Sequence, residues 1–451
     1  MTKRCLLLSM WSRLLLLSGF AAAAFAQPPA QPPAQPNDPK DLLLEVRGNL
    51  NETIGRLPKY MCTLTIDRAQ YQAGGIKGSP SCDALLSEKN KGHLKPRLYE
   101  TDRLRLDVAI SDSANEIYSW VGEDRFDDRD LFQIVRQGAL QTGSYSTFLS
   151  SIFRTAAASF SYNGDVVVDG GQLVEFGFQV PREKSNYVFG NRRDHVTTAY
   201  GGTFLVDPKT GDLTRLVVRT SQLPADVGSC QATTTLDYNR VRLNDLDFLL
   251  PRESQLDIVN TNGDELHNIT AYSACHEFLG ESTLRFDEPG TPAPGKVSPA
   301  TAFALPAGIP FTVVFTQSID PAAAASGDRV KGKLNRAIRD ASSNVLVPEG
   351  SEVMARIVKL QHFSGPPSSF VIGIRLETVN AGGAARPLAA TTNWIGGRFE
   401  KQPGLERRLQ LGSFDTLEDR AIAIFEFRDA GRNRVFGNGL ESAWTTAAPP
   451  N

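Results

Sequence analysis

Alternation of apolar and polar residues at period two runs along most of this chain between residues 60 and 286. Such alternation, interrupted by turn residues, is typical of half-buried strands in an antiparallel sheet. In one hairpin, Asp207-Pro208 and Thr210-Gly211 supply the turn residues. Strands are expected at Tyr60–Ile66, Leu104–Val108, Ile117–Val121, Leu173–Val180, the hairpin 202–218, Ala232–Tyr238, Leu246–Ile258 (broken by Pro251) and Glu265–Tyr272.

Two segments carry helical spacing instead. The first begins at Asp38-Pro39, which is a good cap followed by proline at the first helical position. Its apolar face is predicted to hold Leu43, Val46, Leu50, Ile54 and Leu57, and Pro58 ends it. The second covers Tyr145–Phe153. Residues 41–288 are therefore predicted to form a large antiparallel sheet or half-barrel covered by one or two helices.

A proline- and glycine-rich linker at residues 289–299 separates this part from a second one, because neither strand nor helix continues through such a composition. In residues 300–451, the Pro-Gly turns 305–308 and 347–350 and the turn at Ser326-Gly327-Asp328 stand between short period-two segments. These segments are 311–315, 330–334, 353–358, 370–379 and 421–427. The spacing predicts a small β-barrel or sandwich.

The N-terminus predicts export. A basic start, an apolar stretch after Arg13 and small residues ending at Ala26 are typical of a secretory signal peptide over residues 1–26. A proline-rich spacer follows at residues 27–40. Cleavage after Ala26 removes three basic residues, which leaves 45 basic against 50 acidic, a net charge of −5. No transmembrane span is expected in the mature chain, and no nucleic-acid partner, since nucleic-acid binding needs a basic patch.

Four cysteines remain after Cys5 is removed with the signal peptide: Cys62, Cys82, Cys230 and Cys275. An even number in an exported protein predicts two disulfides, with free buried thiols as the alternative. The local pairing Cys62–Cys82 with Cys230–Cys275 is favoured, and the crossed pairing Cys62–Cys275 with Cys82–Cys230 is the second possibility. The crossed pairing applies if the strands that carry Cys230 and Cys275 flank one central strand.

No residue is assigned a catalytic, cofactor-binding or metal-binding role. The five histidines, His93, His195, His267, His276 and His362, are scattered without metal-ligand spacing. A serine-nucleophile elbow and a phosphate loop are both missing from the sequence. Ser185 with Asp194-His195 is interpreted as a chance resemblance to a triad. Cys275-His276 is interpreted as a disulfide beside an exposed histidine, because adjacent strand residues point to opposite faces.

The densest acidic cluster has two interpretations. It comprises Glu123, Asp124, Asp127, Asp128 and Asp130, with Arg125 and Arg129 between them. Its hard oxygen ligands suit calcium. The spacing is not that of an EF-hand loop, however, and the arginines oppose a bound cation. A solvated loop between strands is therefore favoured over a calcium site.

Three resemblances to known proteins add to these predictions. The turns and strands from Leu305 to Ser351 resemble part of the outer-membrane domain of TrbI-like secretion components, which implies a small barrel. The chain as a whole, on features such as Leu57–Thr63 and Cys275–Phe278, resembles a group of uncharacterised exported two-domain bacterial proteins. One helix followed by a strand meander with a helical cover is similar to the half-barrel of LolA-type lipoprotein carriers.

The leading hypothesis is a non-enzymatic protein of the periplasm or outer membrane that works in binding or assembly. A half-barrel of this size can enclose an apolar cavity for a lipid, with Tyr145–Phe153 as a lid. Alternatively that segment simply packs into the core. The other functional hypotheses are a hydrolase whose site is assembled only in the fold, and a structural or adhesion module presented on the spacer.

Overall fold

The computed structural model describes residues 38–448 except 75–77, 79, 111–115, 124–125, 127–129, 144–146, 191–194, 222, 278–304, 393–394, 397–420 and 429–437. The signal peptide, nearly all of the spacer and the linker at 289–299 lie outside the described residues, and they stay predictions. The fold is mainly β, with a large antiparallel sheet and few helices, as the period-two pattern predicts.

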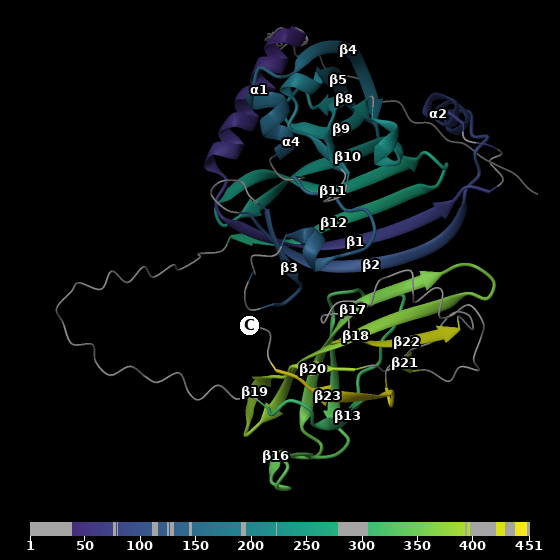
Figure 1. The fold of residues 1–451 in the computed structure, drawn as a ribbon. Helices are drawn as coiled ribbons and strands as arrows, with labels where there is room; N and C mark the ends of the chain where they lie inside the picture. Colours follow the sequence, from purple (N-terminus) through teal and green to yellow (C-terminus); the bar gives the residue numbers. More distant parts are fainter. Residues whose placement is uncertain are drawn as a thin grey trace, which may run out of the picture. The chain divides into compact units, whose positions relative to one another are not determined.

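Ten strands build the sheet of the N-terminal half (Figure 1). In spatial order they run β4–β5–β8–β9–β10–β11–β12–β1–β2–β3, and every pair is antiparallel. Their bounds are β1 Tyr60–Gln72, β2 Arg97–Ile110, β3 Glu116–Trp120, β4 Ser159–Val168, β5 Gly171–Val180, β8 Ala199–Val206, β9 Leu213–Ser221, β10 Ser229–Leu243, β11 Leu246–Asn260 and β12 Glu265–Glu277. A separate small hairpin joins β6 (Val188–Gly190) to β7 (His195–Thr197).

Two helical segments pack on one face of this sheet, which we call the inner face. Helix α1 (Pro39–Arg56) buries Leu42, Val46 and Leu50, which are spaced four residues apart. The predicted apolar face included Val46 and Leu50 but began at Leu43, whereas the buried face begins at Leu42. The short α4 (Thr147–Leu149) continues as a π-helical turn, Ser150–Arg154. Both segments share one core with side chains of β5, β8, β9 and β10. The predicted helical cover is confirmed, and its apolar residues belong to the core.

Two further helices and one strand differ from the expectation. Helix α2 (Cys82–Asn90), capped by the Ser81 side chain, was not predicted, because it buries a single residue and so shows little apolar periodicity. Helix α3 (Leu131–Ile134) spans only four residues. The predicted break at Pro251 is wrong, because β11 runs through this residue at a register shift opposite Tyr238.

The disulfides follow the crossed pairing, Cys62–Cys275 and Cys82–Cys230. The favoured local pairing is therefore wrong. The physical reason is sheet topology: β1 and β12 are neighbours, so Cys62 lies opposite the end of β12, with 4.1 Å between the Cα atoms of Cys62 and Cys275. Cys82 opens α2 and meets Cys230 at the start of β10, with a Cα separation of 5.1 Å.

Strands of the C-terminal half surround a hydrophobic core of their own, which includes Phe315, Phe425 and Trp444. Their order is β22–β18–β17–β14–β13–β23. The bounds are β13 Pro310–Phe315, β14 Arg329–Leu334, β15 Ile338–Arg339, β16 Val345–Val347, β17 Glu352–Phe363, β18 Ser369–Ala381, β19 Ala384–Pro387, β20 Ala390–Thr391, β21 Ile395–Gly396, β22 Ala423–Arg428 and β23 Glu441–Thr446.

A ladder joins the two halves. Residues 361–363 of β17 pair antiparallel with residues 100–102 of β2. The pairing continues as main-chain hydrogen bonds between the 320–328 segment and β2. The N–H of Ser326 donates to the oxygen of Arg103, and the N–H of Arg105 donates to the oxygen of Ser326. Strand β2 therefore carries β1 along one edge and parts of β3 and β17 along the other.

Candidate functional site

A cavity of about 1350 Å³ lies over the inner face of the N-terminal sheet. Its wall is formed by β3, α3, residues 135–143, α4, the β6–β7 hairpin, and residues of β10 and β11. Most of the lining side chains are aliphatic or aromatic. They include Ile117, Tyr118, Leu131, Phe132, Val135, Leu140, Phe148, Tyr187, Val188, Phe189, Tyr200, Leu256 and Ile258.

Three aromatic rings form a continuous part of this wall. The rings of Phe148 and Tyr187 lie 5.4 Å apart edge to face, and those of Tyr187 and Tyr200 lie 5.5 Å apart in the same geometry. Burial raises the pKa of Tyr187 to about 12, so the phenol keeps its proton. The hydroxyls of Tyr187 and Tyr200 bond to Thr234 and Ser151. The two rings therefore present mainly apolar surface to the cavity.

A carboxylate lies in the wall beside this apolar surface. Glu116 of β3 accepts hydrogen bonds from the Tyr118 hydroxyl and from the main-chain N–H of Gly143, the latter at 2.7 Å. Burial and the neighbouring carboxylate raise the pKa of Tyr118 well above its ordinary value, so Tyr118 acts as a donor. The contact from Gly143 fixes one end of the segment 135–143 to β3.

That segment crosses the inner face of the sheet, and we call residues 135–143 the strap. Arg68 of β1 donates to the main-chain oxygen of Gln137 at 2.6 Å, and Asn268 of β12 donates to that of Ala139 at 2.8 Å. The Thr234 hydroxyl of β10 bonds the Gln141 side chain at 3.0 Å. Polar side chains from three strands, together with Glu116 of β3, therefore hold the strap over the sheet.

The segment Tyr145–Phe153, predicted either as a lid or as part of the core, contributes side chains both to the core and to the cavity wall. Ile152 and Phe153 have no exposed surface and pack with α1 and the sheet. Phe148 is buried too, yet it lines the cavity together with Ser151. One short helical segment thus joins the core to the cavity wall, and Tyr145 lies outside the described residues.

Four of the five histidines have hydrogen-bond partners in the structure, and two of the three triad-like residues lie in its described part. Within residues 38–448 as described, no group of three or more His, Cys, Asp or Glu side chains is placed to hold a metal ion. The side chains of His93 and His267 bond to Glu88 and Asp257, and the imidazole of His362 bonds to Ser368. The exposed His276 bonds to the main-chain oxygen of Ala274, beside the disulfide of Cys275.

The Ser185 hydroxyl accepts the N–H of Tyr187, and His195 lines the cavity. Asp194 lies outside the described residues.

Two members of the acidic cluster have structural roles. Asp130 caps α3 in a capping box with Gln133. A carboxylate oxygen of Glu123 lies 3.8 Å from Nη2 of Arg356. Asp124, Asp127 and Asp128, like Arg125 and Arg129, lie outside the described residues, so the solvated-loop and calcium interpretations of the cluster remain open.

The strap and the tyrosine wall were not predicted from the sequence. One signal was present, since Arg68 and Asn268 stand at inward positions of strands whose other inward residues are mostly apolar.

No described helix is long and apolar enough to cross a membrane.

Comparisons with known proteins give distant likenesses. No protein-family model matches the chain, and no curated protein matches it in sequence. Among solved structures, it is similar to a LolA superfamily protein from Nitrosomonas europaea, at 10% identity and a TM-score of 0.23, covering 53% of this chain and 93% of that one. A DUF1329 family protein from Desulfovibrio piger matches at 7% identity and a TM-score of 0.26, covering 54% and 95%. A putative outer membrane lipoprotein-sorting protein domain from Vibrio parahaemolyticus matches at 10% identity and a TM-score of 0.25, covering 53% and 93%.

Proposed function

We propose that this protein is an exported, non-enzymatic cell-envelope module that binds an apolar ligand of lipid type in the cavity over the inner face of its N-terminal sheet. The observation that carries the proposal is the cavity itself, about 1350 Å³ in volume and walled mainly by aliphatic and aromatic side chains. Burying apolar ligand surface against such a wall is favourable by about 25 cal/mol per Å².

The size and polarity of the cavity favour a lipid over a small polar metabolite. Pockets for drug-sized ligands measure about 300–1,000 Å³, so this one has room for a longer molecule. The hydroxyls of Tyr187 and Tyr200 are engaged with protein partners, and Glu116 accepts bonds from Tyr118 and Gly143. A ligand rich in methylene groups fits such a wall better than one that needs many hydrogen bonds.

Export is the second part of the proposal. The basic and apolar pattern of residues 1–26 and the two disulfides support a periplasmic or outer-membrane-associated location, because structural disulfides persist in oxidising compartments. We further propose the boundaries 41–288 for the sheet domain and 300–451 for a small barrel domain. The resemblance of residues 305–351 to a TrbI-like barrel remains a prediction about fold alone.

Native mass spectrometry of the protein purified from the envelope fraction of a Gram-negative host tests the binding function. We expect adducts that denaturing extraction identifies as acyl-chain lipids, in about one copy per chain. A variant with Ile258→Trp, which places an indole in the cavity, serves as the matched sample and should lose the adduct. Protein that carries no lipid, and acquires none from mixed phospholipid vesicles, would refute the function.

A further inference from the structure

Arg356 of β17 is the least exposed charged side chain in the described part of the chain, at 0% of its possible surface. Its guanidinium pairs with Glu377 of β18 through both Nε and Nη2, the latter at 3.3 Å. Nη1 donates to the main-chain oxygen of Gly327 at 2.6 Å. These contacts stay within the C-terminal half.

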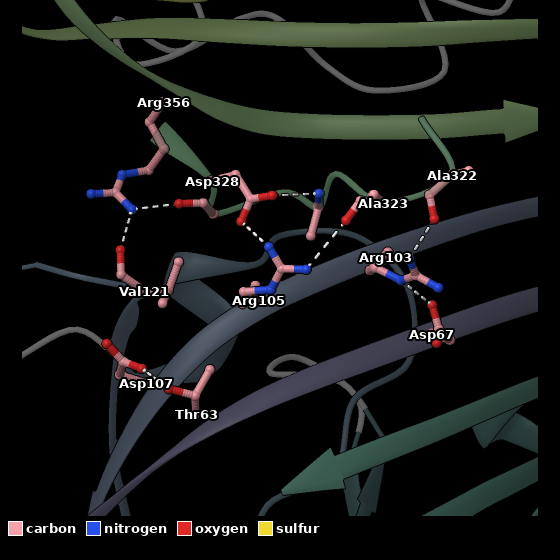
Figure 2. A network of polar contacts seen from close by, with 12 residues as sticks. Thr63, Asp67, Arg103, Arg105, Asp107, Val121, Ala322, Ala323, Asp328 and Arg356 are labelled. Carbon is pink, nitrogen blue, oxygen red and sulfur yellow. Dashed lines mark hydrogen bonds and ion pairs between the residues drawn. The ribbon is translucent and has the colours of Figure 1, made fainter. Parts of the chain in front are cut away.

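The remaining donor capacity of the same guanidinium goes to the N-terminal half. Nη1 also donates to the main-chain oxygen of Val121 at 2.9 Å (Figure 2), and Nη2 lies 3.8 Å from Glu123. Val121 directly follows β3, whose residues Glu116 to Tyr118 form part of the cavity wall. Arg356 therefore reaches the end of the wall strand from a strand of the other half.

Strand β3 needs such an anchor. In the described residues it pairs with β2 alone, over five residues, so its other edge has no strand ladder. The turn after β3 is tied back by Asp107 of β2, which accepts the N–H of Gly122 at 2.8 Å. Arg356 adds a charge-assisted hydrogen bond at the same turn, which is stronger than a bond between neutral groups.

A second side chain of β17 contacts the strap. Nζ of Lys359 donates to the Gln137 side chain at 3.2 Å. Gln137 is also the residue whose main-chain oxygen accepts from Arg68. Arg356 and Lys359, three residues apart on one strand, thus contact Val121, directly after β3, and Gln137 of the strap. Neither contacted residue lines the cavity itself, but each is joined to an element that does.

From these contacts we infer that the C-terminal half contributes to ligand binding. Arg356 is the positioning residue, because it holds the end of β3 and so keeps this strand in its place in the cavity wall. This inference rests on the proposed function for its consequence, the affinity for an apolar ligand. A substitution of Arg356, in the C-terminal half, should therefore loosen a part of the cavity wall that lies in the N-terminal half. Lys359 is assigned the weaker, parallel contact to the strap.

Hydrogen exchange on the ligand-free full chain, read by mass spectrometry, tests the positioning directly. In Arg356→Met we expect peptides covering residues 116–123 to exchange at least about tenfold faster, with no change in β5, β8 and β9. Arg356→Lys keeps the charge beside Glu377 and should restore part of the protection. Arg329→Gln is the matched control, because Arg329 contacts the same Glu377, at 3.3 Å, but not Val121.

Binding of the probe cis-parinaric acid supplies the second readout. Arg356→Met should weaken it at least about fivefold, and Arg329→Gln should leave it unchanged. If Arg356→Met does not fold, Arg356→Lys replaces it and should still exchange faster than the wild type at 116–123, because one ammonium cannot make the contacts of Nε, Nη1 and Nη2 together. Gln137→Ala tests only the contact assigned to Lys359 and should speed exchange in the strap alone.

Two outcomes would overturn the inference for Arg356: unchanged exchange at 116–123 in the folded Arg356 variant, or equal loosening by Arg329→Gln. Unchanged exchange in the strap in Gln137→Ala would overturn the contact assigned to Lys359 alone. Failure of the wild type to bind the probe would instead count against the proposed function. In that case the exchange rates at 116–123 would still decide whether Arg356 positions β3.

Discussion

Gly327 and Arg105 approach each other so closely that a Cβ atom on Gly327 would lie 2.1 Å from the main-chain oxygen of Arg105. The backbone of Gly327 has a φ of +111°, a conformation that side-chain-bearing residues rarely adopt. Around this point, Arg105 pairs with Asp328 at 2.5 Å and donates to the main-chain oxygen of Ala323, as Figure 2 shows. The contact between the two halves at β2 thus requires glycine at position 327.

Gly327→Ala should destabilise the protein by at least about 2 kcal/mol, because it adds a backbone clash to an unfavourable φ. Gly350→Ala is the matched control, since Gly350 has a φ of +76° with nothing within 4 Å of the added atom. That control should cost only about 1 kcal/mol. Urea unfolding of both variants measures the difference, and equal midpoints would show that the close approach does not matter.

The disulfide pairing predicts a specific peptide map. Digestion without reduction should release one linked pair that contains Cys62 and Cys275 and another that contains Cys82 and Cys230. Replacing Cys82 and Cys230 together by serine should lower the free energy of unfolding by about 2–5 kcal/mol, because the bridge closes a long loop in the unfolded chain. A linked Cys62–Cys82 peptide would contradict the crossed pairing.

The carboxyl of Glu100 predicts a pH effect at the β2–β17 ladder. Its pKa is raised from 4.5, first by burial and then by Asp102, although Lys359 and Arg68 oppose the shift. The folded protein therefore holds this proton more tightly than the unfolded chain, so ionisation of Glu100 lowers stability as pH rises from about 4.5 through the raised pKa.

Glu100→Gln removes this titration while keeping a hydrogen-bonding partner for Gln361. Its stability relative to the wild type should increase between about pH 4 and about pH 7, as measured by urea midpoints at each pH. Glu352→Gln, at an exposed position of β17, should show no such trend. A relative stability of Glu100→Gln that falls over this interval would have the wrong sign for a raised pKa.

Strands with strict alternation could be predicted from the sequence because each buries one face against a core. Tyr60–Ile66 in β1 and the hairpin of β8 and β9 are examples, and the structure confirms both. The helix from Pro39 was predictable for a similar reason, since a cap, a proline and a regular apolar spacing all agree at its start.

The cavity wall could not be predicted in the same way. The strap has no period, and its position depends on Arg68, Asn268 and Thr234, which come from three strands that are distant in sequence. The disulfide connectivity likewise required knowing that β12 lies beside β1. These features are set by tertiary contacts between residues more than 60 positions apart, which local patterns do not encode.

Equilibrium titration with cis-parinaric acid of the wild type, Ile258→Trp and Val167→Trp tests lipid binding in the cavity most directly. Ile258 lines the cavity and is 7% exposed, whereas Val167 is 72% exposed on β4 and serves as the control. We predict saturable binding at about one probe per chain in the wild type and in Val167→Trp, and a loss of at least about tenfold in affinity in Ile258→Trp. Equal affinity in all three proteins, or no saturable binding in the wild type, would contradict a lipid site in this cavity.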